Sequence, residues 1–174
     1  MNKIIGIGVI IVLIFISGFA LFSNKQTVPE SSLLSDNTAI TDSETPTGTT
    51  TNIKASFAIF TTGTFRIFTA PMYHNLSENV YIEASNPNTI YVKKAGTTWN
   101  DFFLTLPMKL TSKCLITGTK QTFCTGNSGI LKFYINGVQN NNALSQEIRE
   151  GDKLLVTFGT ESEELIKKQL NKIP

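Results

Sequence analysis

Residues 131–159, LKFYINGVQNNNALSQEIREGDKLLVTFG, decide the fold class of this chain. Residues 130–135 form an aliphatic and aromatic run that predicts a β-strand. This strand is expected to end at Asn136-Gly137, the strongest short signal for a hairpin. Glu150-Gly151-Asp152 predicts a second turn, and the apolar residues 153–158 predict the strand that follows it. This part of the chain is therefore expected to be mostly β-strand.

Two earlier segments, residues 55–69 and 80–93, each predict a further β-hairpin. In the first segment, apolar and β-branched runs lie on either side of Thr61-Thr62-Gly63. In the second segment, similar runs flank Asn86-Pro87-Asn88, which has the residue types of a tight turn.

A short helix is predicted after these hairpins. Thr98 and Asp101 have the spacing of the N-cap and N3 residues of a capping box, and Pro107 discourages continuation of the helix. The large apolar side chains between them recur at i, i+3, i+4 and i+7 and share one face, which we expect to pack in the core. These residues are Trp99, Phe102, Phe103 and Leu106.

A second helix is predicted at the C-terminus. Thr160 and Glu163 have the spacing of another capping box, and the helix is expected to run to about Lys172. Its apolar side chains are expected either to dock the helix on the domain or to pack on a partner. They are Leu165, Ile166, Leu170 and Ile173.

The N-terminus, residues 1–22, is predicted to be a transmembrane anchor or a signal peptide. Residues 4–22 carry no charge, and as a helix they would span about 28 Å, close to the hydrocarbon thickness of a bilayer. Lys3 precedes this run, so the positive-inside rule places the N-terminus in the cytoplasm and the rest of the chain outside it. Gly18 and Ala20 also suit a cleaved signal peptide, and both alternatives export the domain.

A linker is predicted between this segment and the folded part. Seven of the eleven residues 41–51 are Ser or Thr, and residues 23–51 hold too few large apolar groups to form a core. We therefore expect a flexible stalk over residues 23–51, a β-rich exported domain over residues 52–160 and a C-terminal helix over residues 161–174.

Composition excludes several classes of protein. The 15 basic and 13 acidic side chains leave a net charge of only +2, without the basic stripe of a nucleic-acid-binding protein. A hydrophobic fraction of 41% excludes a wholly disordered chain. One His and two Cys cannot form a closed four-ligand zinc site without carboxylates, and no cofactor is expected.

The elements together predict an α+β fold. We expect a β-grasp-like mixed sheet with one short packed helix and a C-terminal helix, preceded by a single N-terminal transmembrane helix. Hairpin, helix, strand, turn and strand is the order of the β-grasp fold, and residues 131–159 resemble the end of a ubiquitin-like or sulfur-carrier-like domain. In those families a C-terminal Gly-Gly does the chemistry, whereas this chain ends in Lys172-Ile173-Pro174, so the resemblance implies the fold and not the activity.

A broader resemblance covers YHNLSENVYIEA, TWNDFF, FYINGV and EGDKLLVTFG, which begin at residues 73, 98, 133 and 150. These motifs are similar to those of uncharacterised membrane-anchored exported domains of prokaryotes. Some of those domains carry several His residues near the first hairpin, which implies a metal site. This chain has only His74 in that region, so no metal site is carried over.

The cysteines carry two alternative predictions. Outside the cytoplasm, Cys114 and Cys124 most simply form a disulfide, which would contribute roughly 2–3 kcal/mol by closing the short loop between them. Two free thiols or an intermolecular link remain open. The order His74, Cys124, Arg149 also resembles sortase-type transpeptidases, with Cys124 as nucleophile, although the Thr-Leu-x-Thr-Cys motif of that family is absent.

Tyr73, His74 and Asn75 form a second group of candidate residues. His74, the only His, and its neighbour Tyr73 lie just before an expected turn and are candidate binding residues. Asn75-Leu76-Ser77 is an N-glycosylation sequon.

These features predict a non-enzymatic, membrane-anchored extracytoplasmic domain. It would lie at the cell membrane and bind an envelope protein, a glycan or a small ligand. The first alternative is a Cys-dependent transpeptidase or hydrolase that uses Cys124. The second is an accessory subunit of an envelope complex, docked through the C-terminal helix.

Overall fold

The structure is a computed structural model that describes residues 49–174. The predicted anchor or signal peptide and nearly all of the predicted stalk lie outside these residues. Over the described range, no helix is both long and apolar enough to cross a membrane.

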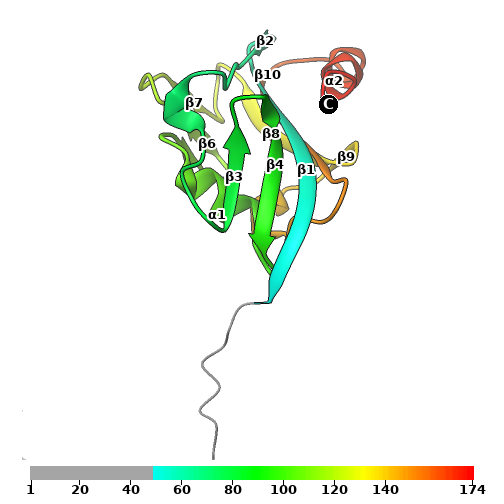
Figure 1. Ribbon diagram of the computed structural model, residues 1–174. Helices are drawn as coiled ribbons and strands as arrows, with labels where there is room; N and C mark the ends of the chain where they lie inside the picture. The colour runs from blue at the N-terminus through cyan, green and yellow to red at the C-terminus, as the bar shows by residue number, and fades with distance from the viewer. Residues whose placement is uncertain (1–48) are drawn as a thin grey trace, which may run out of the picture. The chain divides into compact units, whose positions relative to one another are not determined.

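The described chain forms an α+β fold built on a mixed sheet (Figure 1). Its strand order is β3-β4-β1-β10-β8-β9, and β2 pairs with β1 as well. β1 and β10 are parallel, whereas the other neighbours are antiparallel. The strands are β1 (Thr50–Thr61), β2 (Thr64–Phe65), β3 (Val80–Glu83), β4 (Asn86–Lys94), β8 (Ile130–Ile135), β9 (Val138–Gln139) and β10 (Lys153–Gly159).

Two of the predicted turns connect neighbouring strands through two residues each. Thr62 and Gly63 join β1 to β2 with φ of 47° and 75°, and Asn136 and Gly137 join β8 to β9 with φ of 52° and 82°. Two successive positive φ angles give the turn a twist that matches the twist of the paired strands. Both predicted hairpin turns are therefore confirmed, although β2 and β9 are only two residues long.

The turn between β3 and β4 lies two residues before its predicted position. The chain reverses at Ala84-Ser85, and Asn86-Pro87-Asn88 forms the start of β4. The Asn88 side chain donates a hydrogen bond of 3.0 Å from Nδ2 to the carbonyl oxygen of Phe57 in β1. The backbone pairing of β4 with β1 begins only at Thr89, so the missing N–H of Pro87 leaves no gap in that ladder.

The predicted capping box and the buried face of α1 (Trp99–Thr105) are both confirmed. The Asp101 amide donates to Thr98 Oγ1 at 3.2 Å, and the Thr98 amide donates to Asp101 Oδ2 at 2.8 Å. The four apolar residues expected in the core are buried: Trp99, Phe102, Phe103 and Leu106. Among them, the rings of Phe102 and Phe103 pack edge-on against Phe57 of β1.

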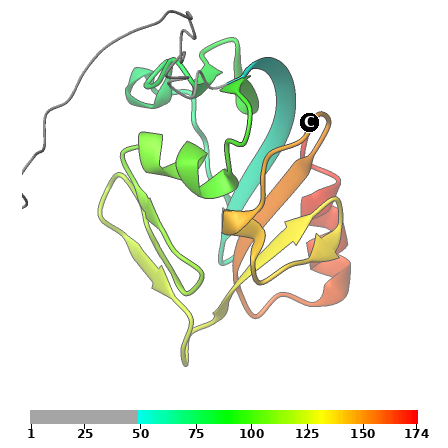
Figure 2. The same ribbon diagram turned by 90° about the horizontal axis from the view of Figure 1, so that it is seen from below.

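A second, smaller sheet packs beside α1 on the same face of the main sheet, which we call the inner face (Figure 2). It consists of β5 (Lys109–Leu110), β6 (Cys114–Ile116) and β7 (Thr122–Cys124). Leu115 is fully buried in the shared core, and the Phe123 ring lies 5.5 Å from that of Phe158 in β10. The sequence predicts no strand between Pro107 and Ile130, because strands this short carry no measurable periodicity.

The C-terminal helix α2 (Glu163–Leu170) covers part of the opposite face of the main sheet (Figure 2). Ile166 and Ile173 are buried there against Phe60 and Tyr134, whereas Leu165 is 48% exposed. Burial, with contributions from two nearby glutamates, raises the pKa of the Tyr134 hydroxyl. Of the two expected roles, the helix therefore docks on its own domain.

The start of α2 differs from the prediction. Ser162 and not Thr160 is the N-cap, because Ser162 Oγ accepts a hydrogen bond of 3.4 Å from the Leu165 amide. The i,i+4 ion pair between Glu164 and Lys168 forms at 2.8 Å, on the exposed side of the helix.

A matched pair of substitutions tests how α2 docks. Ile166→Ala should lower the free energy of unfolding by about 2–3 kcal/mol, because it removes buried methyl groups and leaves a cavity. Leu165→Ala, on the exposed side of the same helix, should change it by less than about 0.5 kcal/mol. Urea unfolding of the full chain measures both, and equal effects would contradict the docking of α2 on the sheet.

Candidate functional site

A cleft of about 300 Å³ lies between the first hairpin and the small sheet. One wall comes from the end of β1, from residues 65–68 and from the short 3₁₀ helix η1 (Pro71–Tyr73). The other wall comes from Met108, from Leu115 of β6 and from residues 117–119 of the β6–β7 turn. Its apolar side chains are Ile59, Phe65, Ile67, Phe68, Tyr73, Met108 and Leu115. A concave, mainly apolar surface of this size is typical of small-molecule sites.

Tyr73, a candidate residue from the sequence, lies in the wall of this cleft. Its ring packs edge-on against Phe68 at 5.1 Å, and its hydroxyl faces the β6–β7 turn. A Cβ at Gly118 of that turn would lie 3.2 Å from Tyr73 Oη and 3.0 Å from the carbonyl oxygen of Pro107. The absence of a side chain at residue 118 thus lets the small sheet approach η1 and form the cleft.

His74, the other candidate, lies next to the cleft and does not line it. Its Nε2 is 2.8 Å from the carbonyl oxygen of Phe68, and this hydrogen bond holds the 66–68 segment against η1. Phe68 and Tyr73, the residues on either side of this contact, both line the cleft. We interpret the role of His74 there as positioning.

Asn75 has an exposed side chain and a left-handed backbone, with φ of 52°. Its amide donates a hydrogen bond of 3.0 Å to the carbonyl oxygen of Ile82 in β3. The glycosylation sequon therefore lies at the surface beside the edge strand of the sheet.

Arg66 is the charged residue in the cleft wall, and it is not among the candidates that the sequence indicates. Its Nε donates to Thr61 Oγ1 at 2.6 Å, and its Nη1 donates to Gln121 Oε1 at 3.1 Å. The guanidinium carbon lies 5.0 Å from the centre of the Phe123 ring. The signal in the sequence was a single cation within the apolar run 65–68, FRIF, which also fits an ordinary surface position on a strand.

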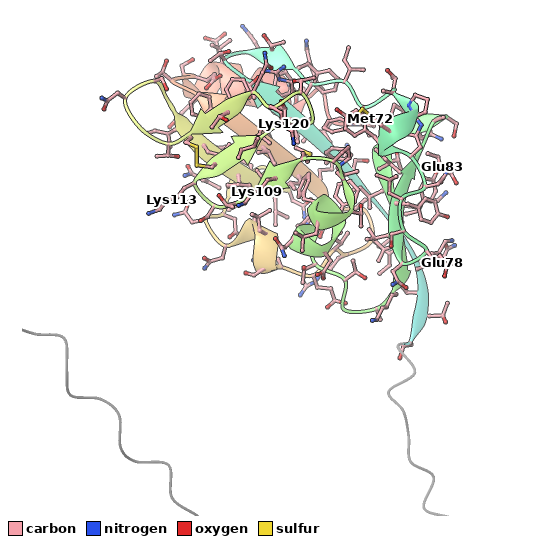
Figure 3. The ribbon with its side chains drawn as sticks, turned by 90° about the vertical axis from the view of Figure 1, so that its left-hand side faces the viewer. Met72, Glu78, Glu83, Lys109, Lys113 and Lys120 are labelled. Atoms are coloured by element: carbon pink, nitrogen blue, oxygen red, sulfur yellow. A yellow bond between two sulfur atoms is a disulfide. The ribbon has the colours of Figure 1, made fainter. Side chains whose placement is uncertain are left out.

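The small sheet beside Arg66 is cationic. Residues 102–146 include four lysines and no Asp or Glu, and three of these lysines belong to the small sheet and its turns, whereas Lys132 lies in β8. Figure 3 shows Lys109, Lys113 and Lys120 on the small sheet, whereas Glu78 and Glu83 lie on the β3 side of the same view. Met72 of η1, also labelled there, is 50% exposed. It lies beside the β6–β7 turn, because a Cβ at residue 118 would be 3.5 Å from Met72 Cε. The cleft therefore opens beside a surface that favours anions.

The disulfide between Cys114 and Cys124 is confirmed. The two residues face each other across β6 and β7, with a Cα–Cα distance of 4.1 Å. The bond fastens together the two strands whose connecting turn forms one wall of the cleft.

The three residues of the sortase-like alternative, Cys124, His74 and Arg149, are each held in other contacts. The sulfur of Cys124 is bonded to Cys114, so Cys124 has no free thiol. After Cys124 the chain enters β8 at Ile130, and Ile130 pairs with Gly159 at the C-terminal end of β10. Arg149 precedes the start of β10, at the other end of that strand, and its amide donates to Asp152 Oδ2. The His74 ring is hydrogen-bonded to the carbonyl oxygen of Phe68. Residues 49–174 also contain no cluster of three or more metal-ligating side chains.

No protein-family model matches the chain, and neither do the curated proteins or the solved structures compared with it.

Labelling of thiols tests the disulfide. Alkylation of the unfolded full chain should add no label before reduction and two labels after it, as read by intact mass. Reduction should also lower the free energy of unfolding by roughly 2–3 kcal/mol, because it frees the loop between β6 and β7 in the unfolded chain. Label on Cys124 without reduction would overturn the assignment and make that thiol the first candidate for catalysis.

Proposed function

We propose that the chain is a membrane-anchored, extracytoplasmic binding domain with a β-grasp-like core, and that the cleft beside Tyr73 is its ligand site. The cleft is the observation that carries the proposal, because it is preformed, mainly apolar and closed on one side by a disulfide-fastened sheet. A rigid wall of this kind lowers the entropic cost of ordering a site when a ligand binds.

The order of the strands supports a β-grasp-like core. β1 and β10 lie side by side and parallel at the centre of the sheet, with β4 beyond β1 and β8 and β9 beyond β10. α1 follows the β4 strand and crosses the inner face before β8 begins. With β1 and β4 as the antiparallel pair, α1, β8 and β10 follow along the chain in the order on which the resemblance is based. β2 and β3 lie between β1 and β4 in the chain, and the small sheet lies between α1 and β8.

Export and anchoring rest on the apolar residues 4–22 and on the disulfide. A disulfide between neighbouring strands persists in an oxidising compartment, which agrees with a domain outside the cytoplasm. The domain would then face envelope proteins, glycans and small molecules. Of these ligands, a small molecule suits a cleft of about 300 Å³ best.

A sortase-like transpeptidase or hydrolase using Cys124 remains the alternative. It requires a thiolate, and the sulfur of Cys124 is bonded to Cys114. The enzyme would therefore have to be reduced before it could act, which makes the binding domain the better-supported function.

Fluorine NMR with 3-(4-fluorophenyl)propionamide tests the cleft as a binding site. This neutral probe has an aromatic ring that suits the Phe68 and Tyr73 walls, and about 0.3 kcal/mol per heavy atom gives a dissociation constant in the millimolar range. We expect binding to the full chain in lipid nanodiscs, after subtraction of the partitioning measured with empty nanodiscs.

Two tryptophan substitutions serve as a matched pair. Thr119→Trp adds bulk at the cleft and should weaken binding of the probe at least fivefold, whereas Thr122→Trp, on an exposed position of β7 outside the cleft, should leave it unchanged. Equal affinity of both variants would move the binding site elsewhere and contradict the assignment.

A further inference from the structure

We propose that the ligand of the cleft is a small carboxylate with an apolar, aromatic body, and that Arg66 pairs with its charged end. This inference rests on the proposed function of the cleft and adds the chemical class of the ligand. It is argued from three properties of the Arg66 side chain: its charge, the hydrogen bonds that hold it in place and the charges around it.

Arg66 is a cation without an anionic partner in the part of the chain that the structure describes. A guanidinium has five N–H donors. The hydrogen bonds given to Arg66 use two of them, and both acceptors, Thr61 Oγ1 and Gln121 Oε1, are neutral. The ion pair found among residues 49–174 is Glu164–Lys168, on the far side of the main sheet. A ligand carboxylate would supply the missing negative charge and can accept two parallel N–H bonds.

The guanidinium is held in place before any ligand arrives. Its two bonded nitrogens are tied to different elements, the end of β1 and the β6–β7 turn, and the Phe123 ring lies against it. The side chain is half-buried, so part of its hydration has already been removed. A planar guanidinium that is already oriented loses little rotamer entropy when it binds a carboxylate.

The surrounding charges favour an anion. The 45 residues between Asp101 and Glu147 contain lysine as their only charged residue type. Glu161, which lies near the β1–β2 turn, accepts a hydrogen bond of 3.1 Å from the Gly63 amide. An anion that approaches the cleft from the side of the small sheet meets a positive potential, whereas Glu161 contributes negative charge at the β1–β2 turn.

The rest of the cleft determines the other end of the ligand. Beyond Arg66 the walls are the aromatic rings of Phe68 and Tyr73 and the aliphatic side chains of Ile59 and Leu115. Aromatic walls favour an aromatic ligand through edge-on or offset contacts. The volume lies at the lower end of the range for small-molecule sites, which favours a single ring with a short acidic arm over a polymer.

Arg66 could instead serve only to link the first hairpin to the small sheet through its hydrogen bonds. With this purely structural role, replacing Arg66 lowers stability, but the cleft has no preference between a carboxylate and its neutral amide. The two roles are therefore separated by comparing ligands of the same shape and different charge.

The experiment compares 3-(4-fluorophenyl)propionate with its amide on the full chain in nanodiscs at pH 7. The carboxylate should bind at least tenfold more tightly than the amide, and Arg66→Gln should abolish this preference while affinity for the amide stays within twofold. Arg66→Lys, which keeps the charge without the planar guanidinium, should restore part of the preference. Lys113→Gln removes the same charge from the exposed end of the small sheet and should leave the preference above fivefold.

The outcomes separate the two proposals. Equal binding of the two probes, or an unchanged preference in Arg66→Gln with its melting temperature preserved, would overturn the carboxylate assignment and leave the cleft as a neutral site. A preference lost equally in Lys113→Gln would assign it to the general field of the small sheet and overturn the direct pairing. Binding of neither probe would overturn both the ligand class and the proposed function of the cleft.

Discussion

The alternation of side chains along β1 is the constraint on which the rest of the structure depends. This strand pairs with β2, β4 and β10, and its side chains point alternately to the two faces of the sheet. Phe57 and Ile59 enter the core shared with α1 and the small sheet, whereas Ala58 and Phe60 form the core under α2. A shift of β1 by one residue would exchange the two faces and separate both helices from their packing partners.

The small sheet depends on this core and in turn forms the cleft. Its strands are too short to be stable alone, and they are held by the disulfide, by buried Leu115 and by the contact between Phe123 and Phe158. Once held there, the β6–β7 turn lies against η1, where Gly118 permits the close approach to Tyr73. The cleft is thus a consequence of how a disulfide-fastened hairpin packs on the main sheet.

Much of the fold could be predicted from local patterns. The capping box at Thr98, the buried face of α1 and the Asn136-Gly137 turn depend on residues within one or two turns of chain, and the structure confirms them. The reversal at Ala84-Ser85 and the small sheet were not predicted. In the first case a bond from Asn88 to β1 keeps the turn-like residues in a strand, and in the second case the strands are stabilised by distant contacts.

The sequence by itself determined the α+β class, the short helix and the apolar N-terminal run, because each follows from composition or from neighbours along the chain. For the two cysteines it offered a disulfide as the simplest of several alternatives, and the structure shows that bond. Only the tertiary structure decided the parallel pairing of β1 with β10, the face on which α2 docks and the position of Arg66 in a cleft. The physical reason is distance along the chain. Arg66 is fixed by Gln121, 55 residues away, and no local pattern encodes a contact of that separation.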